Sequence, residues 1–321
     1  MQRLIPVLIA IAGAAYGLDI GADWAESRGG RIVQDALANA VEADFRASWI
    51  DDADLAAIGK LTTLKRIDLS HTRITDIGFQ RLKNLPSVEA MNLYFAEQIG
   101  DGAMAAMKNW KRLRALNVRG TKITDAGVAH LANIATLESL DIGYALVTDA
   151  GLEPLSNLPN LHALSFGGNK MSDAALTALR LFPALTSLDL SGSQRTDSGL
   201  WSVALTDQGL DVIAGLTNLR ELTLRGAKIT DAGFQKLASL QNLESLDISQ
   251  TQLSVNGLMV LKNFRKLRSL NVWGDPRVGD ELIPLIESLP DLRWVDCAET
   301  KITQAAAERL QQARPGRRVK R

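Results

Sequence analysis

A segment of 24 residues recurs along most of this 321-residue chain and limits the possible folds more than any other feature. Residues 110–133, WKRLRALNVRGTKITDAGVAHLAN, show its form. The L-x-x-L-x-V part fits a short strand with one buried face. In the second part, Thr124 is placed to cap a short helix, and Asp125 lies in the first turn, where a negative charge is favoured. Because a period of this length with this leucine spacing is typical of solenoids, we predict a solenoid.

Eleven such units align over residues 37–312. They begin at Leu37, Leu61, Leu85, Trp110, Ile134, Leu158, Phe182, Leu216, Leu240, Phe264 and Leu289. The first unit lacks several leucines and is predicted to be the N-terminal cap. Strands stack about 4.8 Å apart, whereas helices need nearer 10 Å, so the column has to curve with its strands inside. We expect an α/β horseshoe with a parallel concave sheet and helices on the convex face.

The repeat also resembles a known family. The form L-x-x-L-D-L-S-x-T-x-I-T-D-x-G-L, as in residues 64–79, is similar to leucine-rich repeats of the 24-residue subclass seen in exported bacterial proteins. It is also similar to the repeats of eukaryotic F-box substrate receptors. The resemblance covers residues 37–312. It implies a curved solenoid whose concave face usually holds a protein or a peptide.

The two chain ends carry different signals. Residues 1–15 combine a positive start, an apolar run and an A-x-A-like site, which is the pattern of a signal peptide. The alternative is an uncleaved anchor, although the apolar run is short for a span of about 20 residues. Residues 16–36 are predicted to be a linker, and residues 313–321 a basic disordered tail. We therefore expect an exported protein (periplasmic, cell-surface or secreted), with a membrane-anchored protein as the alternative.

Aromatic and arginine side chains follow several strands, just beyond the last leucine position. Tyrosine, tryptophan and arginine are enriched at binding hot spots. The candidate partner-binding residues are Tyr94, Phe95, Arg119, Tyr144, Trp201, Arg225 and Trp273. Because the first four come from three successive units, they are predicted to form one patch. The alternative is that these aromatic residues pack over the strand ends and cover the backbone.

A polar residue separates the last two leucines of each strand, and from Asp141 onward aspartate alternates with a neutral residue. This row is expected to face the concave side. One interpretation is a polar ladder whose side chains bond to neighbouring strands and loops. The other is an acidic trough for a basic peptide or a cation.

The unit that begins at Phe182 carries a ten-residue insertion within residues 192–204, between its strand and its helix. The insertion is polar and glycine-rich apart from Leu200, Trp201 and Val203. Insertions in solenoids lie in loops on one face, often the binding face. Trp201 is therefore expected either to anchor a partner or to hold the loop against its own scaffold.

Nothing in the sequence indicates catalysis. His71, His130 and His162 occupy different repeat positions, and no metal-binding, phosphate-loop or nucleophile motif is present. The chain has 36 basic and 36 acidic residues, so the overall charge favours no nucleic acid. Its one cysteine, Cys297, cannot form an intramolecular disulfide and is predicted to be a core residue. We expect no enzyme activity, no metal and no cofactor.

The sequence therefore predicts a non-catalytic scaffold, expected to be a monomer, that binds a protein or peptide on its concave face. Membrane contact is expected only through a possible N-terminal anchor. One alternative is a substrate adaptor of an SCF-type ubiquitin ligase, which rests on similarity to F-box repeats alone, since no F-box-like helical segment precedes the repeats. Another is a structural envelope protein whose concave face binds nothing specific.

Overall fold

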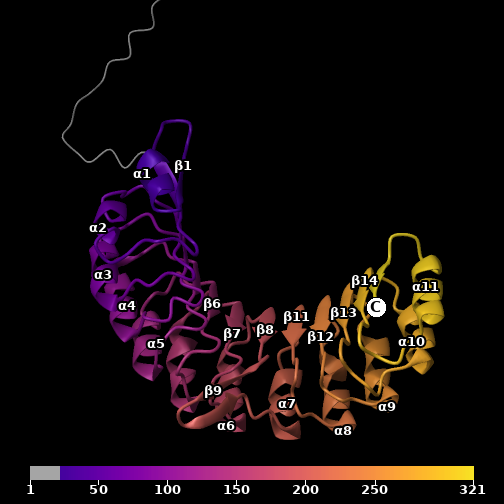
Figure 1. Cartoon of the computed structure of the whole chain (residues 1–321). Helices are drawn as coiled ribbons and strands as arrows, with labels where there is room; N and C mark the ends of the chain where they lie inside the picture. The colour runs from indigo at the N-terminus through magenta and orange to yellow at the C-terminus, as the bar shows by residue number, and fades with distance from the viewer. Residues whose placement is uncertain (1–21) are drawn as a thin grey trace, which may run out of the picture.

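The computed structural model describes residues 22–321 and shows a horseshoe. Strands line its inner side and helices cover its outer side (Figure 1). A 13-stranded sheet runs from β1 to β15 in chain order, and only β9 and β10 stand apart from it. This architecture confirms the predicted α/β solenoid. The predicted signal peptide or anchor, residues 1–15, lies outside the described residues.

Each repeat contributes one short parallel strand, and neighbouring strands pair without a shift, as where Leu116 faces Leu140. The strands of the repeats are β2 (Ala40–Asp44), β3 (Arg66–Asp68), β4 (Ala90–Asn92), β5 (Ala115–Asn117), β6 (Ser139–Asp141), β7 (Ala163–Ser165), β8 (Ser187–Asp189), β11 (Glu221–Thr223), β12 (Ser245–Asp247), β13 (Ser269–Asn271) and β14 (Trp294–Asp296). In the three-residue strands the middle side chain points into the core and its two neighbours face the concave side. In β2 the core position is held by Ala43.

Short helices form the convex layer, because each unit leaves few residues after its strand and turns. The α-helices are α2 (Leu55–Ile58), α3 (Asp76–Phe79), α4 (Asp101–Ala106), α5 (Asp125–Leu131), α6 (Asp173–Ala178), α7 (Asp207–Ala214), α8 (Asp231–Gln235), α9 (Val255–Leu258), α10 (Ile283–Ser288) and α11 (Gln304–Gln312). The 3₁₀-helices are η1 (Gln80–Leu82), η2 (Met107–Asn109), η3 (Asp149–Gly151), η4 (Glu153–Asn157), η5 (Leu179–Leu181), η6 (Lys236–Ser239), η7 (Met259–Asn263) and η8 (Asp280–Leu282).

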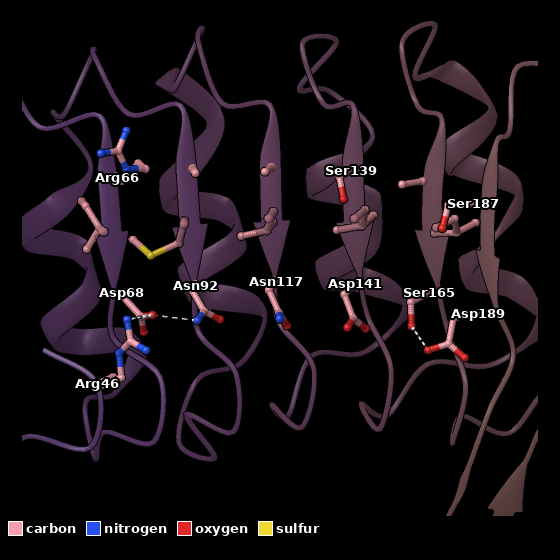
Figure 2. A pocket seen from close by; sticks show the side chains of 18 of the residues that line it. Arg46, Arg66, Asp68, Asn92, Asn117, Ser139, Asp141, Ser165, Ser187 and Asp189 are labelled. Atoms are coloured by element: carbon pink, nitrogen blue, oxygen red, sulfur yellow. Dashed lines mark hydrogen bonds and ion pairs between the residues drawn. The ribbon is translucent and has the colours of Figure 1, made fainter. Parts of the chain in front are cut away.

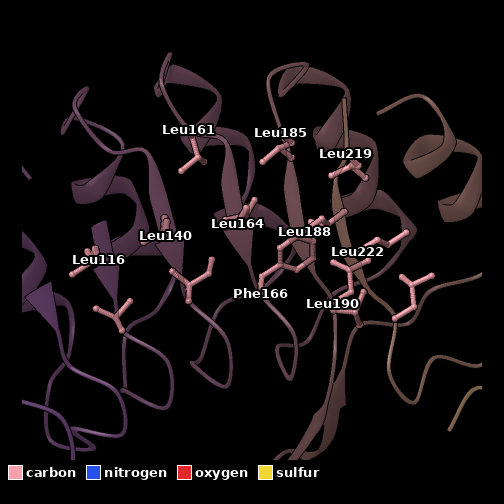
Figure 3. Close-up of a cluster of buried hydrophobic side chains, with 14 of the residues drawn as sticks. Leu116, Leu140, Leu161, Leu164, Phe166, Leu185, Leu188, Leu190, Leu219 and Leu222 are labelled. Atoms are coloured by element: carbon pink, nitrogen blue, oxygen red, sulfur yellow. The ribbon is translucent and has the colours of Figure 1, made fainter. Parts of the chain in front are cut away.

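The core is a continuous layer between the strands and the helices. Leucines from successive strands, such as Leu140, Leu164 and Leu188, lie side by side in it and are buried (Figure 3). Burial of a leucine side chain contributes about 1.5–3 kcal/mol. Since each unit packs only on its neighbours, the stability of the solenoid is a sum of unit and interface contributions.

The Asp-x-Gly sequence at the helix start joins one unit to the next. Asp101 accepts hydrogen bonds from the backbone N–H of Thr124 at 2.8 Å and from its hydroxyl at 2.7 Å. The Thr124 oxygen in turn caps α5 by accepting from the N–H of Ala126. Gly127 leaves room for the Asp101 carboxylate, because a Cβ atom at this position would lie 2.3 Å from it. Each aspartate therefore fixes the helix cap of the following unit.

This contact recurs along the convex side with one interruption. The repeating pairs are Asp52–Thr75, Asp101–Thr124, Asp125–Thr148, Asp149–Ser172, Asp173–Thr206, Asp207–Thr230, Asp231–Ser254 and Asp280–Thr303. Asp76 makes the same kind of contact to the N–H of Gly100. At the start of α9 the aspartate is replaced by Val255, and in the next unit Leu282 takes the place of the glycine.

The prediction of a linker over residues 16–36 is wrong for the part that the structure describes. Helix α1 (Ala22–Ser27) and strand β1 (Arg31–Gln34) fold onto the first repeat, and β1 pairs antiparallel with β2. The Trp24 ring packs edge-on against Phe45, with 5.6 Å between the ring centroids. This segment orders because it covers the apolar end of the solenoid, which would otherwise face water.

The prediction of a disordered tail over residues 313–321 is also wrong. Strand β15 (Arg318–Lys320) extends the sheet by pairing in parallel with β14. The N–H of Cys297 donates to the carbonyl of Lys320 at 2.8 Å, and Lys320 pairs with Asp296 at 2.9 Å. The free edge of β14 supplies hydrogen-bonding groups that outweigh the repulsion among the five positive charges.

Candidate ligand-binding surface

The backbone turns sharply three residues after each repeat strand, always with a positive φ. The residues at this turn are Ala47, His71, Phe95, Gly120, Tyr144, Gly168, Gly192, Gly226, Gln250, Gly274 and Glu299. Glycine suits this left-handed region because it has no Cβ atom, and a bulky side chain there is uncommon. His71, Phe95 and Tyr144 are therefore exceptions, and packing has to hold them in place.

Four rings pack together along this edge of the concave face: His71, Tyr94, Phe95 and Tyr144, here called the aromatic ridge. The centroid distances are 5.2 Å from His71 to Tyr94, 4.7 Å from Tyr94 to Phe95, and 6.5 Å from Phe95 to Tyr144. His71 was not among the residues expected at this surface. Its repeat position, which is glycine in five other units, is the signal that could have revealed it.

Two rings of the ridge, Phe95 and Tyr144, lie over glycines of the following turns. A Cβ atom on Gly120 would come within 2.8 Å of the Phe95 ring. Cβ atoms on Gly168 and Gly192 would come within 2.8 Å and 1.9 Å of Tyr144. The rings of Phe95 and Tyr144 therefore depend on glycine at the turn of the following unit. The aromatic residues do cover backbone, as the alternative interpretation requires, yet all four rings remain partly or fully accessible.

Arg119 connects the ridge to the concave floor. Its guanidinium lies 4.5 Å from the centroid of the Tyr144 ring, and its side chain is only 16% exposed. The Nη1 atom lies 3.2 Å from the Ser165 hydroxyl, 3.5 Å from Asp141 and 3.7 Å from Asp189. Burial raises the pKa of the Asp141 carboxyl, against the lowering effect of the Gly143 N–H and of Arg119. Arg119 thus spans three further units and neutralises the central carboxylates.

An open groove of about 500 Å3 follows the concave face of the N-terminal half, beside the ridge. The small side chains along its floor are Ala90, Ala115, Ser139, Ala163 and Ser187. Figure 2 shows the polar row next to them, which consists of Asp68, Asn92, Asn117, Asp141, Ser165 and Asp189.

Contacts within the polar row favour the interpretation as a structural ladder. Asn92 donates to Asp68 at 2.9 Å, and Ser165 donates to Asp189 at 3.3 Å. Members of the row also accept from the backbone N–H two residues later, as Asp141 does from Gly143 at 2.8 Å. Arg46 lies 3.7 Å from Asp68, so an arginine stands near both ends of the row. These contacts satisfy the carboxylates and leave little negative charge for a cationic ligand.

The two candidate residues of the C-terminal half form a separate pair. Arg225 lies 5.0 Å from the ring centroid of Trp273 and donates to Gln250 at 3.4 Å. The side chain of Arg225 is otherwise exposed. The structure therefore does not bring these two residues together with the ridge, which lies in the N-terminal half of the horseshoe.

The insertion folds as an antiparallel hairpin of β9 (Ser193–Thr196) and β10 (Gly199–Ser202). Gln194 donates to the carbonyl of Ala145 at 2.7 Å, so the hairpin contacts the unit that carries Tyr144. Trp201 lies opposite Gln194 and hence on the same face of the hairpin. The Trp201 side chain is half-buried and donates to Ser198 at 2.9 Å. Gln194 therefore holds the hairpin against the solenoid, whereas the hydrogen bond of Trp201 stays within the hairpin, and its role stays a prediction. On the opposite face, Leu200 is 67% exposed.

The described part of the chain offers no arrangement of three or more His, Cys, Asp or Glu side chains that could hold a metal ion. Burial raises the pKa of the Cys297 thiol to about 11, as suits a small core residue. Across residues 22–321, no helix has the length and apolar character needed to cross a membrane.

Comparisons with known proteins agree with this architecture. A family profile described as "Leucine Rich repeat" matches residues 60–82, 113–132, 133–156, 215–238 and 239–262. Comparison with curated protein sequences gives no significant match. An internalin of Listeria monocytogenes is 25% identical, with a TM-score of 0.60 over 83% of this chain and 70% of that one. A leucine-rich repeat protein of Leptospira interrogans is 15% identical, with a TM-score of 0.45 over 83% of this chain and 86% of that one.

The sequence period, the curved parallel sheet and the profile matches agree on one family. The profile matches fall on both sides of the hairpin insertion, so the assignment covers both halves of the horseshoe. The chain is a leucine-rich repeat protein.

Proposed function

We propose that the protein is a non-catalytic scaffold that binds a peptide, or an extended segment of another protein, over the N-terminal half of its concave face. The aromatic ridge is the main contact. The observation that carries this proposal is that four rings and Arg119 lie together at the edge of an open groove. Aromatic and arginine side chains are the residue types that contribute most to binding at protein interfaces.

Contacts within the protein hold the side chains of this surface in place. The glycine turns hold the rings of Phe95 and Tyr144, and Ser165 and Asp189 hold the guanidinium of Arg119. Ordering a flexible side chain on binding costs about 0.5–1.5 kcal/mol. A ligand that meets the ridge avoids most of this cost, which favours the ridge over the more exposed Arg225 as the primary contact.

The groove floor indicates what the ligand presents. Small side chains such as Ala115 and Ala163 leave room for larger ligand side chains. The nearby carboxylates are already paired, so apolar contacts and hydrogen bonds rather than a strong positive charge carry recognition. Asn117 uses its oxygen to accept from the Arg119 N–H at 3.0 Å, and its amide N–H2 group remains available to a ligand carbonyl.

The test is a selection of displayed peptides on the wild-type protein, followed by affinity measurements on variants. Tyr94→Ala combined with Tyr144→Ala should weaken the selected peptides at least about tenfold, since each ring is of the hot-spot type. Trp273→Ala is the matched control because Trp273 occupies the same repeat position as Tyr94. Circular dichroism checks that each variant is folded. Equal affinity of the double variant and the control would remove the ridge as the binding surface.

We also infer that the protein is exported, with an uncleaved anchor as the alternative. The support is the charge and apolar pattern of residues 1–15. Intact mass of the protein recovered from fractionated host cells tests this proposal. Loss of the first residues in an exported fraction agrees with cleavage, and a full-length product in the membrane agrees with an anchor. A full-length product in the cytosol would contradict both.

A further inference from the structure

A basic cleft lies at the C-terminal end of the horseshoe, far from the aromatic ridge. It has a volume of about 400 Å3 and lies between the segments 290–293 and 314–317. Its charged lining residues are Asp291, Arg293, Arg314 and Arg317. Three guanidinium groups and one carboxylate give the cleft a net charge of about +2, since arginine stays protonated in proteins.

Arg317 is the unusual member of this group, because its side chain is almost fully buried, with 3% exposed. Its Nε atom donates to the carbonyl of Leu292 at 3.2 Å, and its Nη1 atom donates to the carbonyl of Leu310 at 3.3 Å. The Nη2 atom is also buried and has no hydrogen-bond partner in the described residues. A buried guanidinium N–H without a partner is costly, so this atom calls for a missing acceptor.

The geometry places the unpartnered atom on the cleft side. In a planar guanidinium, Nη2 lies on the same edge as the Nε–H, and this edge faces Leu292, which lines the cleft. Burial lowers the pKa of Arg317, and the neighbouring positive charge of Arg314 acts in the same direction. Both effects would be reduced by an anion bound at this edge.

The other two arginines stand at the rim. Arg314 donates to the carbonyl of Leu289 at 2.8 Å and to the carbonyl of Pro290, which fixes its position. Arg293 is exposed, and no carboxylate lies within ion-pair distance of it in the described residues. The turn through Gly316 is loosely packed, since a Cβ atom there would contact nothing within 4 Å. A small displacement of this turn would open a path to Nη2.

We propose that this cleft binds a phosphate group carrying two negative charges, with Arg317 as the buried partner and Arg293 and Arg314 at the rim. Guanidinium groups match the oxygens of phosphate with paired hydrogen bonds. The net charge of the cleft balances a dianion. Both free inorganic phosphate and the phosphate monoester of a larger molecule carry this group.

Titration calorimetry on the full chain tests the proposal, with inorganic phosphate as the probe and chloride at equal ionic strength as the reference. We expect one saturable site. Arg293→Gln should weaken it about tenfold, the loss typical of one charge-assisted contact. Arg220→Gln is the matched control, because Arg220 holds the same repeat position three units away and should leave binding unchanged.

A second variant, Arg317→Lys, keeps the charge but removes the planar fork, and it should abolish saturable binding while circular dichroism reports a folded protein. Glycerol 3-phosphate, a phosphate monoester, distinguishes free inorganic phosphate from a phosphorylated molecule as the ligand. Tighter binding of the monoester than of phosphate indicates a phosphorylated molecule, and equal or weaker binding indicates the free ion. Absence of saturable binding in the wild type, or equal loss in the Arg293 and Arg220 variants, would overturn the proposal and leave Arg317 bonded to a buried water.

Discussion

The two halves of the horseshoe place the same residue types at the same repeat positions with different results. Arg119 and Arg225 are equivalent, and each lies over an aromatic ring. Arg119 is held by Ser165, Asp141 and Asp189, whereas Arg225 donates only to Gln250 at 3.4 Å. The difference shows that neighbouring turns and acceptors, more than the residue type, decide whether a side chain is positioned for binding.

The backbone differs between the halves as well. In the N-terminal half, His71, Phe95 and Tyr144 adopt positive φ angles of 50–55°. A side chain in this conformation costs about 1–2 kcal/mol relative to the right-handed region. In the C-terminal half, Gly226 and Gly274 adopt this conformation freely, whereas Gln250 and Glu299 carry the same cost. What distinguishes the N-terminal half is that three of its strained turns carry aromatic side chains, and backbone strain is common at binding sites.

The largest expected effect comes from filling a glycine beneath the ridge. Gly168→Ala would place a Cβ atom 2.8 Å from the Tyr144 ring, whereas Gly226→Ala, at nearly the same φ, would contact nothing. Both variants incur a backbone cost of about 1 kcal/mol. The Gly168 variant should lose a further 1–3 kcal/mol, roughly, through overpacking. Urea denaturation measures both, and equal losses would show that Tyr144 moves aside freely.

Replacing the equivalent arginines of the two halves should give a smaller difference in the free energy of unfolding. Arg119→Met leaves Asp141 and Asp189 without their shared cation and should lower the free energy of unfolding by about 2 kcal/mol, since the cluster is only partly exposed. Arg225→Met should stay within about 0.5 kcal/mol of the wild type. A similar loss in both variants would contradict the proposed difference in restraint.

The Arg119 variant also carries a pH signature with a definite sign. Burial already raises the pKa of Asp141 above its ordinary value of 3.8, and loss of Arg119 raises it further. Asp141 then binds a proton more tightly in the native state than in the unfolded state. The variant's stability therefore falls as the pH rises and Asp141 loses its proton. The deficit of Arg119→Met should therefore shrink as the pH is lowered from neutral into the acidic range in which Asp141 takes up its proton. A deficit independent of pH would exclude the electrostatic cause.

The smallest expected effect concerns the hairpin latch. Gln194→Ala removes the contact to Ala145 and should cost about 1 kcal/mol or less, mainly as faster hydrogen exchange across residues 193–202. Arg195→Ala is the control, because Arg195 lies on the opposite face beside the exposed Leu200. If the backbone amides of both variants exchange at the same rate, the Gln194 contact does not hold the hairpin, and only its two chain connections do.

Most of the fold follows from the sequence because the 24-residue period fixes a strand, a turn and a helix in every unit. The ridge was only partly predictable. Tyr94, Phe95 and Tyr144 stand out by residue type, but the left-handed turn that holds His71 is visible only when all units are aligned. The hydrogen bond from Arg119 to Ser165 joins residues 46 positions apart, and no pattern within one unit indicates it.

The chain ends were the least predictable part. Residues 22–34 contain several polar, charged and glycine residues, and residues 318–320 include two basic ones, so their local composition favours a linker and a tail. They order because the first and last repeats each present an apolar layer and an unpaired strand edge. Such ordering is decided by the surface left open by the neighbouring unit, a property of the assembled solenoid.

The interruption at Val255 divides the convex side unequally. At other junctions an aspartate accepts hydrogen bonds from the helix cap of the next unit, so that unfolding of one unit destabilises its neighbour. Between α9 and α10 these hydrogen bonds are missing, because Val255 replaces the aspartate, and Leu282 occupies the position of the glycine. In a linear array of coupled units, a weak coupling sets the place where the array comes apart. The last two repeats and β15 therefore form a short cooperative block that can open while the ridge-bearing half stays intact.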